Sequence, residues 1–300
     1  MKLRYRHLIL FTVLSAVWGA AFTVVKALLP EVNAVALAAF RYDVAGLLML
    51  AYIFLGPYQW RPRGVRNWRL VSVGGVFFIA AHFSFLFTGQ RYVTSAVAAV
   101  GTGTIPLITP ALAVFLLDRE GLDMVGWIGI ISGFVGVVVI AGPEPGNLLN
   151  ASTVGMAFIL MSSVWFSLGA VLTRRYRTDL STPTHMTWSM LVGAVLLHLY
   201  LLTVPGISAS AVEWSNSTVT GLIYLAVVAG AGGFLIYFYL LDEVGATEIN
   251  LVDYVLPFFA ALSGWILLGE GLRPATWLGF GFILLGFGLV KRHAIRQELG

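Results

Sequence analysis

Long apolar runs alternate with short polar segments along the whole chain. Each run has about the 17–25 residues that a helix needs to cross the hydrocarbon core of a bilayer. The connecting segments are too short for a soluble domain. The pattern therefore predicts an all-α membrane protein with ten transmembrane helices. The ten predicted spans are Leu8–Leu28, Ala34–Leu55, Leu70–Thr88, Val93–Leu117, Met124–Ala141, Thr153–Leu172, Thr184–Val204, Val219–Leu240, Thr247–Leu268 and Ala275–Val290.

Composition supports this prediction. Hydrophobic residues make up 59% of the 300 residues and charged residues only 11%, whereas ordinary soluble domains carry roughly 25% charged residues. The formal net charge of +4 does not indicate nucleic-acid binding, because the basic residues cluster in short loops. The chain has no cysteine, which excludes disulfides, thiolate nucleophiles and cysteine metal sites. We expect a multi-pass protein of the plasma or inner membrane, with the lipid bilayer as a partner.

Lysine and arginine are distributed unequally between alternate loops. Clusters at residues 2–6, 61–69, 174–177 and 291–296 fall on one side of the ten spans. The loops on the other side carry only Lys26, Arg91 and Arg273. Loops rich in lysine and arginine stay in the cytoplasm, so both termini are predicted to be cytoplasmic.

The two halves of the chain resemble each other. Trp18 in the first span corresponds to Trp165 in the sixth, and Pro106 in the fourth corresponds to Pro257 in the ninth. Each unit holds five spans, an odd number, so the units must have opposite orientations. We predict two inverted repeats, residues 1–142 and 150–293, in a single integrated transmembrane unit. This arrangement is typical of secondary transporters.

The fourth span is broken near its middle by glycine and proline. Backbone groups freed at membrane depth must be satisfied by protein or by water in a cavity. We expect hinges at these breaks and at the matching proline of the ninth span. The hinge residues are Gly101, Gly103, Pro106, Pro110 and Pro257.

Four local motifs resemble the EamA-type branch of the drug/metabolite transporter superfamily. They are Ser-x-Val-Trp-Gly (Ser15–Gly19), Phe-Arg-Tyr (Phe40–Tyr42), Pro-Leu-x-x-Pro (Pro106–Pro110) and Leu-Gly-Glu-x-Leu (Leu268–Leu272). The resemblance covers essentially the whole chain, although the first half has Leu-Asp-Arg-Glu at residues 117–120 in place of the Leu-Gly-Glu ending. It implies a membrane carrier with a central cavity lined by spans one to four and six to nine. It also implies export of amino acids, other metabolites or toxic compounds.

Charged residues inside spans are candidate functional groups, because each costs at least a few kcal/mol there. Arg41 could anchor a substrate carboxylate through its fork of donors or tie helix ends together as a structural residue. Asp43 could bind an amine, carry a proton or belong to a buried pair. Two residues apart on a helix, they face different directions and need different partners.

Asp253 is the sharper candidate. Asn250, Asp253, Tyr254 and Pro257 share one helical stripe at the i, i+3, i+4, i+7 spacing. The carbonyl of Asp253 is the one that Pro257 leaves without a donor. Thr102 holds the equivalent position before the proline of the fourth span. We predict polar substrate contacts at both breaks.

Aromatic residues and one histidine complete the predicted substrate site. Trp18 and Trp165 lie too centrally in their spans for an interfacial belt, so they face either the cavity, where they could stack on a cationic or aromatic substrate, or the core. Trp188 and Tyr237 could also reach the cavity. His82 could relay protons or pack as a hydrogen-bonded core residue. No histidine or carboxylate set has metal-ligand spacing, so no metal and no cofactor are expected.

We therefore expect a secondary transporter that exports amino acids or related small metabolites by alternating access. The alternative substrate is an amphiphilic or cationic drug. An enzyme is not expected, because no nucleophile–base set occurs, and a purely structural protein has no need of broken spans. Glycines in the fifth and tenth spans permit close packing, either within the monomer or in a homodimer.

Overall fold

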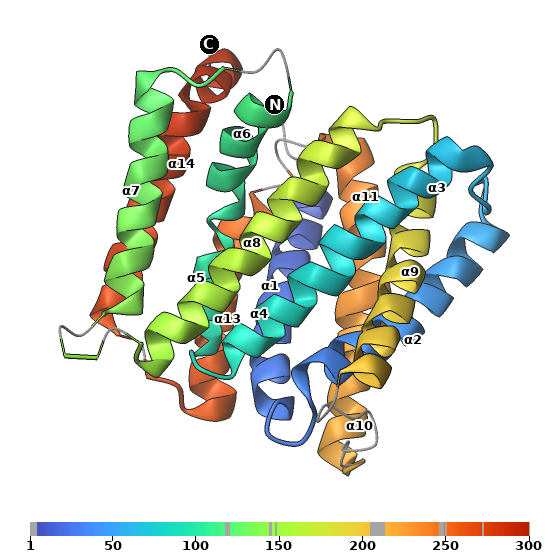
Figure 1. Ribbon diagram of the computed structural model, residues 1–300, viewed down its shortest axis with the longest axis horizontal. Helices are drawn as coiled ribbons and strands as arrows, with labels where there is room; N and C mark the ends of the chain where they lie inside the picture. The colour runs from blue at the N-terminus through green and yellow to red at the C-terminus, as the bar shows by residue number, and fades with distance from the viewer. Residues whose placement is uncertain are drawn as a thin grey trace.

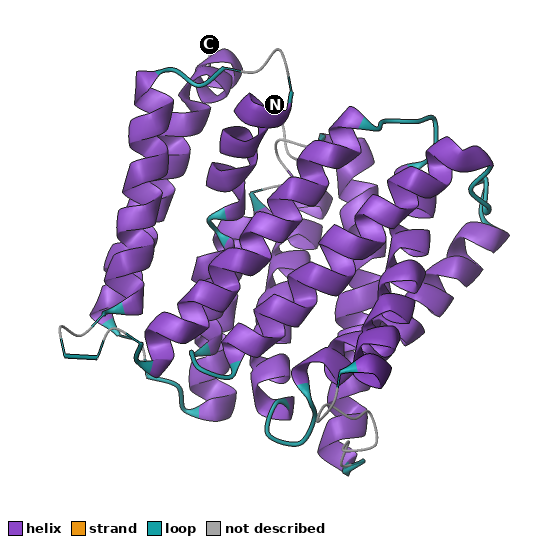
Figure 2. Ribbon diagram, in the orientation of Figure 1, coloured by secondary structure: helices purple, strands orange, loops and turns teal. Residues whose placement is uncertain are grey.

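The described part of the molecule is helical throughout. The computed structural model describes residues 5–117, 121–143, 146–147, 149–204, 214–245, 249, 251–271 and 273–299, with side chains to residue 292. Figure 2 shows helices joined by loops in this part. The helices are α1 (Tyr5–Leu28), α2 (Ala34–Leu55), α3 (Gly64–Val73), π-helical η1 (Gly74–Ala81), α4 (His82–Gln90), α5 (Ser95–Thr102), α6 (Ile105–Leu116), α7 (Met124–Ala141), α8 (Ala151–Arg175), α9 (Thr182–Thr203), α10 (Asn216–Ile223), π-helical η3 (Tyr224–Gly232), α11 (Gly233–Val244), α13 (Val252–Leu268) and α14 (Pro274–Leu299).

Nine helical segments in the described ranges are long and apolar enough to cross a bilayer. The remaining predicted span, the ninth, corresponds to α13, whose 17 residues extend about 25 Å at 1.5 Å per residue. An all-α membrane protein is consistent with these helices. The inverted repeat, the cytoplasmic position of the termini and the division at residues 142 and 150 stay predictions.

Three predicted boundaries differ from the structure by five or more residues. The third span begins at Gly64 instead of Leu70, because its polar first turns continue the helix while long side chains reach toward water. The ninth was predicted from Thr247, but its described helix begins at Val252, and residues 246–248 and 250 lie outside the described residues. The tenth was predicted to end at Val290, whereas α14 continues to Leu299.

Glycines set the closest helix crossings. A Cβ on Gly19 of α1 would lie 2.6 Å from Phe259 Cβ of α13, and one on Gly155 of α8 would lie 3.0 Å from the Gly89 carbonyl oxygen of α4. α9 packs in the same way on η1, where Gly193 lies against Gly75. Without a hydrophobic force between helices in lipid, such close backbone approach is a main source of association.

The pair α7 and α14 shows this packing most clearly. Gly129 lies against Gly286 and Gly136 against Gly279, in antiparallel order. In Figure 1 the two helices stand side by side at one edge of the bundle, next to α6. These four glycines therefore pack within the monomer, while Gly281 and Gly288 face open space. The alternative homodimer stays a prediction, and it would have to use faces other than these four glycines.

The start of α1 and the end of α14 lie at the same end of the bundle (Figure 1), here called the terminal end. At the opposite end, polar contacts join distant segments. Lys26 Nζ donates to the carbonyl oxygens of Gln90 (2.8 Å) and Arg91 (3.1 Å). Glu270 Oε2 accepts from the backbone N–H of Ser95 at 2.9 Å. These bonds close the opposite end around α1, α4, α5 and α13.

Glu31 adds a further contact at the opposite end, between α1–α2 and the start of α10. Its carboxylate accepts hydrogen bonds from Ser215 Oγ (2.5 Å), Thr218 Oγ1 (2.5 Å) and Ser217 Oγ (3.2 Å). The Ser215 and Thr218 hydroxyls hold the pKa of Glu31 below its usual range, because they stabilise the ionised carboxylate. Glu31 therefore accepts these hydrogen bonds most strongly when its carboxylate is ionised.

We expect alanine at Gly129 or Gly136 to lower the free energy of unfolding by about 1–3 kcal/mol, the usual effect of overpacking a tight site. A Cβ at residue 129 would lie 2.6 Å from the Gly286 carbonyl oxygen, so the helices must separate. Melting in detergent measures the effect. Gly281→Ala and Gly288→Ala are matched controls on open faces, where alanine stabilises a helix by up to about 1 kcal/mol. Equal melting temperatures in all four variants would contradict the close crossing.

Acid should weaken the Glu31 contact. A lowered pKa in the folded state contributes stability above the unfolded-state pKa of about 4.3, and that stability is lost as the pH falls through the folded pKa. We expect Glu31→Gln to melt below the wild type at pH 7, and the difference to shrink as the pH falls below about 4.3 and through the folded pKa. Asp242→Asn, an exposed acid, is the control. A difference that persists unchanged at acid pH would show that charge plays no part.

Candidate functional site

Trp18, near the middle of α1, is the centre of an aromatic cluster. Its indole Nε1 donates to the Ala229 carbonyl oxygen of η3 at 3.0 Å. Its ring stacks on Tyr237 with centroids 5.7 Å apart and meets Phe234 edge-on at 5.7 Å. Gly233 permits this approach, because a Cβ there would clash with the indole nitrogen. The indole and the phenol thus form a rigid aromatic wall between α1 and α11.

The π-helical segments are part of this arrangement. η3 supplies the carbonyl that Trp18 binds, and η1 interrupts the third span at the corresponding place, Gly74–Ala81. π-Segments inside α-helices occur frequently at functional sites. The sequence analysis did not predict either segment. A glycine pair marks each segment in the sequence, Gly74-Gly75 and Gly232-Gly233. Such pairs are equally typical of ordinary close packing between helices.

Arg41 lies in α2 and is 6% exposed. Its guanidinium carbon lies 5.2 Å from the ring centroids of both Tyr42 and Phe83, and 6.0 Å from that of Phe87. Its buried Nε has no hydrogen-bond partner in the described part of the chain. No carboxylate of the described residues forms an ion pair with Arg41. The structure therefore holds a buried positive charge against aromatic rings with a donor left free.

Tyr224 connects Arg41 with the aromatic wall. The Tyr224 hydroxyl donates to the Val17 carbonyl oxygen at 2.9 Å, one residue from Trp18. It also lies close enough to the Arg41 guanidinium to interact with it electrostatically. Tyr224 was not among the predicted site residues, because its place beside Arg41 depends on how η3 crosses α2.

Asp253 lies in the first turn of α13. The sequence had placed it inside a longer helix; the described helix begins one residue before it. Its carboxylate lies close enough to Tyr237 and Tyr254 to interact electrostatically with both hydroxyls. The Tyr254 hydroxyl is buried without a hydrogen-bond partner in the described residues. Asn250, predicted on the same stripe, lies outside the described residues.

Asp43 has a partner of its own. Its Oδ2 lies 2.7 Å from His198 Nε2 of α9, and both side chains are about one-third exposed, 37% and 35%. The Phe40 ring covers His198 edge-on at 5.7 Å. Asp43 and Arg41 thus face different neighbours, and Asp43 is separate from the Trp18 cluster.

Three further predicted site residues lie on neighbouring helices: His82 on α4, Trp165 on α8 and Thr102 on α5. His82 is 5% exposed, and its Nδ1 lies 3.0 Å from the Ser162 carbonyl oxygen. Trp165 packs against Phe77, with its buried Nε1 unpartnered among the described residues. The Thr102 hydroxyl donates to the Ala99 carbonyl oxygen of its own helix. His82 and Trp165 thus lie together at α8, while Thr102 bonds within α5.

Trp188 lies at the terminal end of the bundle, away from Trp18. Its Nε1 donates to the Trp60 carbonyl oxygen at 2.7 Å, and its ring meets Trp68 edge-on at 5.2 Å. An amphipathic ring in this place is typical of a membrane interface. The structure therefore groups Trp188 with the loop between α2 and α3.

The fourth span is interrupted at Gly103, one of the predicted hinges, and hinge movement stays a prediction. α5 ends at Thr102 and α6 begins at Ile105, with Gly103 and Thr104 between them. Pro106 falls in the first turn of α6, where its missing N–H costs nothing. Pro110 and Pro257 lie inside α6 and α13, and Gly101 lets α5 pack on Ile159 of α8.

The chain matches the model of the EamA-like transporter family over residues 6–142 and again over 153–292. An "Uncharacterized transporter" of Archaeoglobus fulgidus is 28% identical, over 92% of this chain and 95% of its own. The "Uncharacterized inner membrane transporter YedA" of Escherichia coli K12 is 27% identical, over 96% of this chain and 92% of its own. A solved crystal structure has a TM-score of 0.62 over 98% of this chain and 99% of its own; at 19% identity the likeness is one of fold. This multi-pass membrane protein belongs to the EamA-like transporter family, within the drug/metabolite transporter superfamily.

Proposed function

We propose that the protein is a secondary transporter of the plasma or inner membrane that exports amino acids or related small metabolites by alternating access. The observation that carries the proposal is the buried Arg41 guanidinium with its free Nε. A substrate carboxylate is the partner that this group lacks. The names of the related proteins support transport as the activity.

The energetics favour an anionic group beside Arg41. A charged side chain inside the membrane costs about 2.5–3.5 kcal/mol or more. The three aromatic faces within 6.0 Å offset part of this cost, at about 0.5–2 kcal/mol for a cation–π contact. A carboxylate would receive two parallel, charge-assisted hydrogen bonds from the guanidinium fork. Binding therefore satisfies a donor that the empty protein leaves unpaired.

The aromatic wall gives the rest of the substrate a surface. Trp18 and Tyr237 offer a broad, partly buried face next to Tyr224, which interacts with Arg41. Apolar side chains can pack on such a face, and an ammonium group can lie over it. A small molecule with a carboxylate and an apolar or cationic part is the substrate class that fits this surface.

Alternating access would use the breaks in the helices. The α5–α6 interruption and the two π-segments flank the proposed path. The bonds from Lys26 and Glu270 close the opposite end, so opening toward that side requires breaking them. The chain has no G-x-x-x-x-G-K-[ST] nucleotide loop. We infer that an ion or substrate gradient drives transport.

An amphiphilic cation is the second candidate substrate. Asp253 interacts with Tyr237, whose ring stacks on Trp18. An acid beside stacked aromatic rings is a suitable environment for a cation. In this alternative Asp253, and not Arg41, determines binding.

Substitution of Arg41 tests the carboxylate site. Charge-assisted hydrogen bonds contribute about 1.5–3 kcal/mol, so we expect Arg41→Gln to raise the KM for an amino acid roughly 10–150-fold. Arg41→Lys keeps the charge but loses the fork, and should fall between the two. Counterflow by purified protein in liposomes measures the change.

Arg91→Gln is the matched control, because it removes an exposed arginine in a loop. The melting temperature separates binding from folding. If Arg41→Gln lowers the melting temperature while the remaining folded protein keeps the wild-type KM, Arg41 is a structural tie. If the loss of Asp253 alone abolishes uptake of a lipophilic cation, the second candidate replaces the first.

We further propose that Asp253 carries the coupled proton, because it is an intramembrane carboxylate without an ion pair among the described residues. We expect Asp253→Asn to lose uptake driven by a pH gradient across liposomes and to keep substrate counterflow, because exchange needs no net proton movement. Asp43→Asn is the control, since that acid already pairs with His198. Full gradient-driven uptake by the double variant would exclude both acids from coupling.

A further inference from the structure

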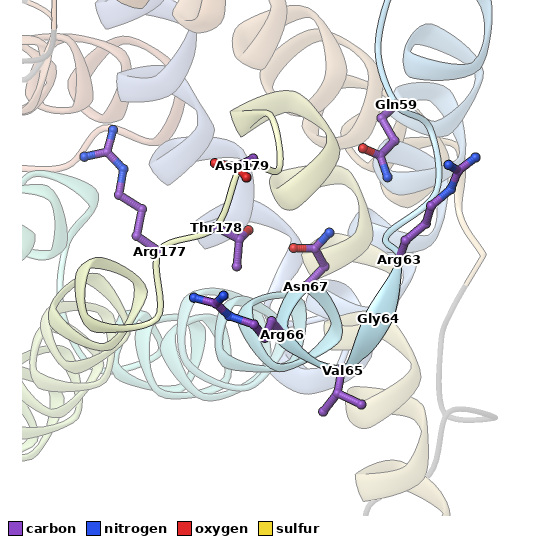
Figure 3. Close-up of a pocket in the computed structure, with 9 residues that line it drawn as sticks. All are labelled: Gln59, Arg63, Gly64, Val65, Arg66, Asn67, Arg177, Thr178 and Asp179. Carbon is purple, nitrogen blue, oxygen red and sulfur yellow. The ribbon is translucent and has the colours of Figure 1, made fainter.

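A basic hollow lies at the terminal end of the bundle, away from the proposed substrate path. It has a volume of about 780 Å³ and is formed by the loop before α3, the first turn of α3 and the segment after α8. Figure 3 shows Arg66 and Asn67 of α3 between Arg177 on one side and Arg63 on the other. Gln59, Thr178 and Asp179 complete its polar lining.

The hollow carries unmatched positive charge. Three arginines, Arg63, Arg66 and Arg177, are among the residues that line it, and Asp179 is the single acid in the lining. None of the three guanidinium groups forms a hydrogen bond or ion pair with another described residue. The neighbouring Arg69 differs, because its guanidinium lies 3.7 Å from the centre of the Tyr176 ring. Three arginines without a partner among the described residues, placed around one cavity, are suited to an anion with several oxygens.

Aromatic residues fix the depth of the hollow in the membrane. Trp188 binds the Trp60 carbonyl oxygen and packs on Trp68. Trp60 and Trp68 also line a second hollow of about 380 Å³, which shares Arg63 and Gly64 with the first. Tryptophan rings concentrate at the level of lipid headgroups. The basic hollow therefore opens at the depth where phosphate groups of lipids lie.

We propose that this hollow binds the phosphate of an anionic phospholipid headgroup from the adjacent leaflet. Arg66 and Arg177 reach the phosphate from the two segments, and Gln59, Asn67 and Thr178 supply neutral donors. The ligand joins the α2–α3 loop to the end of α8. Basic pockets between transmembrane helices bind anionic headgroups in this manner. The lipid site is independent of the transported substrate.

The test compares lipid-dependent stability of four proteins. Wild type, Arg66→Gln/Arg177→Gln, Arg66→Lys/Arg177→Lys and Arg91→Gln/Arg273→Gln are placed in nanodiscs of phosphatidylcholine, with and without phosphatidylglycerol. We expect phosphatidylglycerol to raise the melting temperature of the wild type. The Gln variant should lose more than half of this shift and the Lys variant should keep part of it. Arg91→Gln/Arg273→Gln loses the same charge elsewhere and should keep the whole shift.

Inorganic phosphate in pure phosphatidylcholine nanodiscs separates the two sources of the same chemical group. We expect no shift at millimolar phosphate, because the lipid is held at the right depth by its chains. If free phosphate reproduces the shift in the wild type and not in the Gln variant, the lipid assignment is overturned. Equal shifts for the two Gln double variants would overturn the site itself, since general membrane charge would then explain the effect.

Discussion

Close backbone contact at glycines is the constraint on which the rest of this structure depends. In lipid, helices gain little from burying apolar side chains against each other, so association needs short distances and good packing. Gly19 brings α1 onto α13, Gly193 brings α9 onto η1, and Gly129 and Gly136 bring α7 onto α14. With larger side chains at these crossings, the broken helices could not lie next to α1.

This packing determines the surroundings of two charged residues, Arg41 and Asp253. α1 lies between α11 and α13 and holds Trp18 against Tyr237. Arg41 interacts electrostatically with Tyr224, and Asp253 interacts electrostatically with Tyr237. In the described residues neither charge forms an ion pair with an opposite charge. A carrier needs charged groups without a protein partner, because a fully hydrogen-bonded network leaves no donor or acceptor for a substrate.

Apolar run length predicted most helices well. The ranges of α2 and α7, Ala34–Leu55 and Met124–Ala141, agree at both ends, because their boundaries coincide with polar caps such as Asn33 and Asp123. Run length failed at α3, where a polar helical start resembles a loop. It also failed at η1 and η3, because apolar segments of eight and nine residues show no periodicity that separates a π-helix from an α-helix.

The candidate site was harder than the fold to predict from the sequence. Their charge inside predicted spans identified Arg41 and Asp253 as candidates, but it did not predict which residues surround them. The bond from Asp43 to His198 and that from Glu270 to Ser95 join residues far apart in the chain, and no local pattern encodes them. Trp188 was predicted near the cavity from its repeat-related position, whereas the fold places it beside Trp60. Pairings of this kind depend on helix crossings, which spacing alone does not specify.

The most direct measurement of the central claim is ligand-dependent melting of the wild-type protein with an amino acid and with the corresponding amino acid amide. The two ligands differ only in the carboxylate. If the Arg41 guanidinium binds that group, the amino acid raises the melting temperature and the amide does not, and the difference disappears in Arg41→Gln. Equal stabilisation by acid and amide would contradict the account.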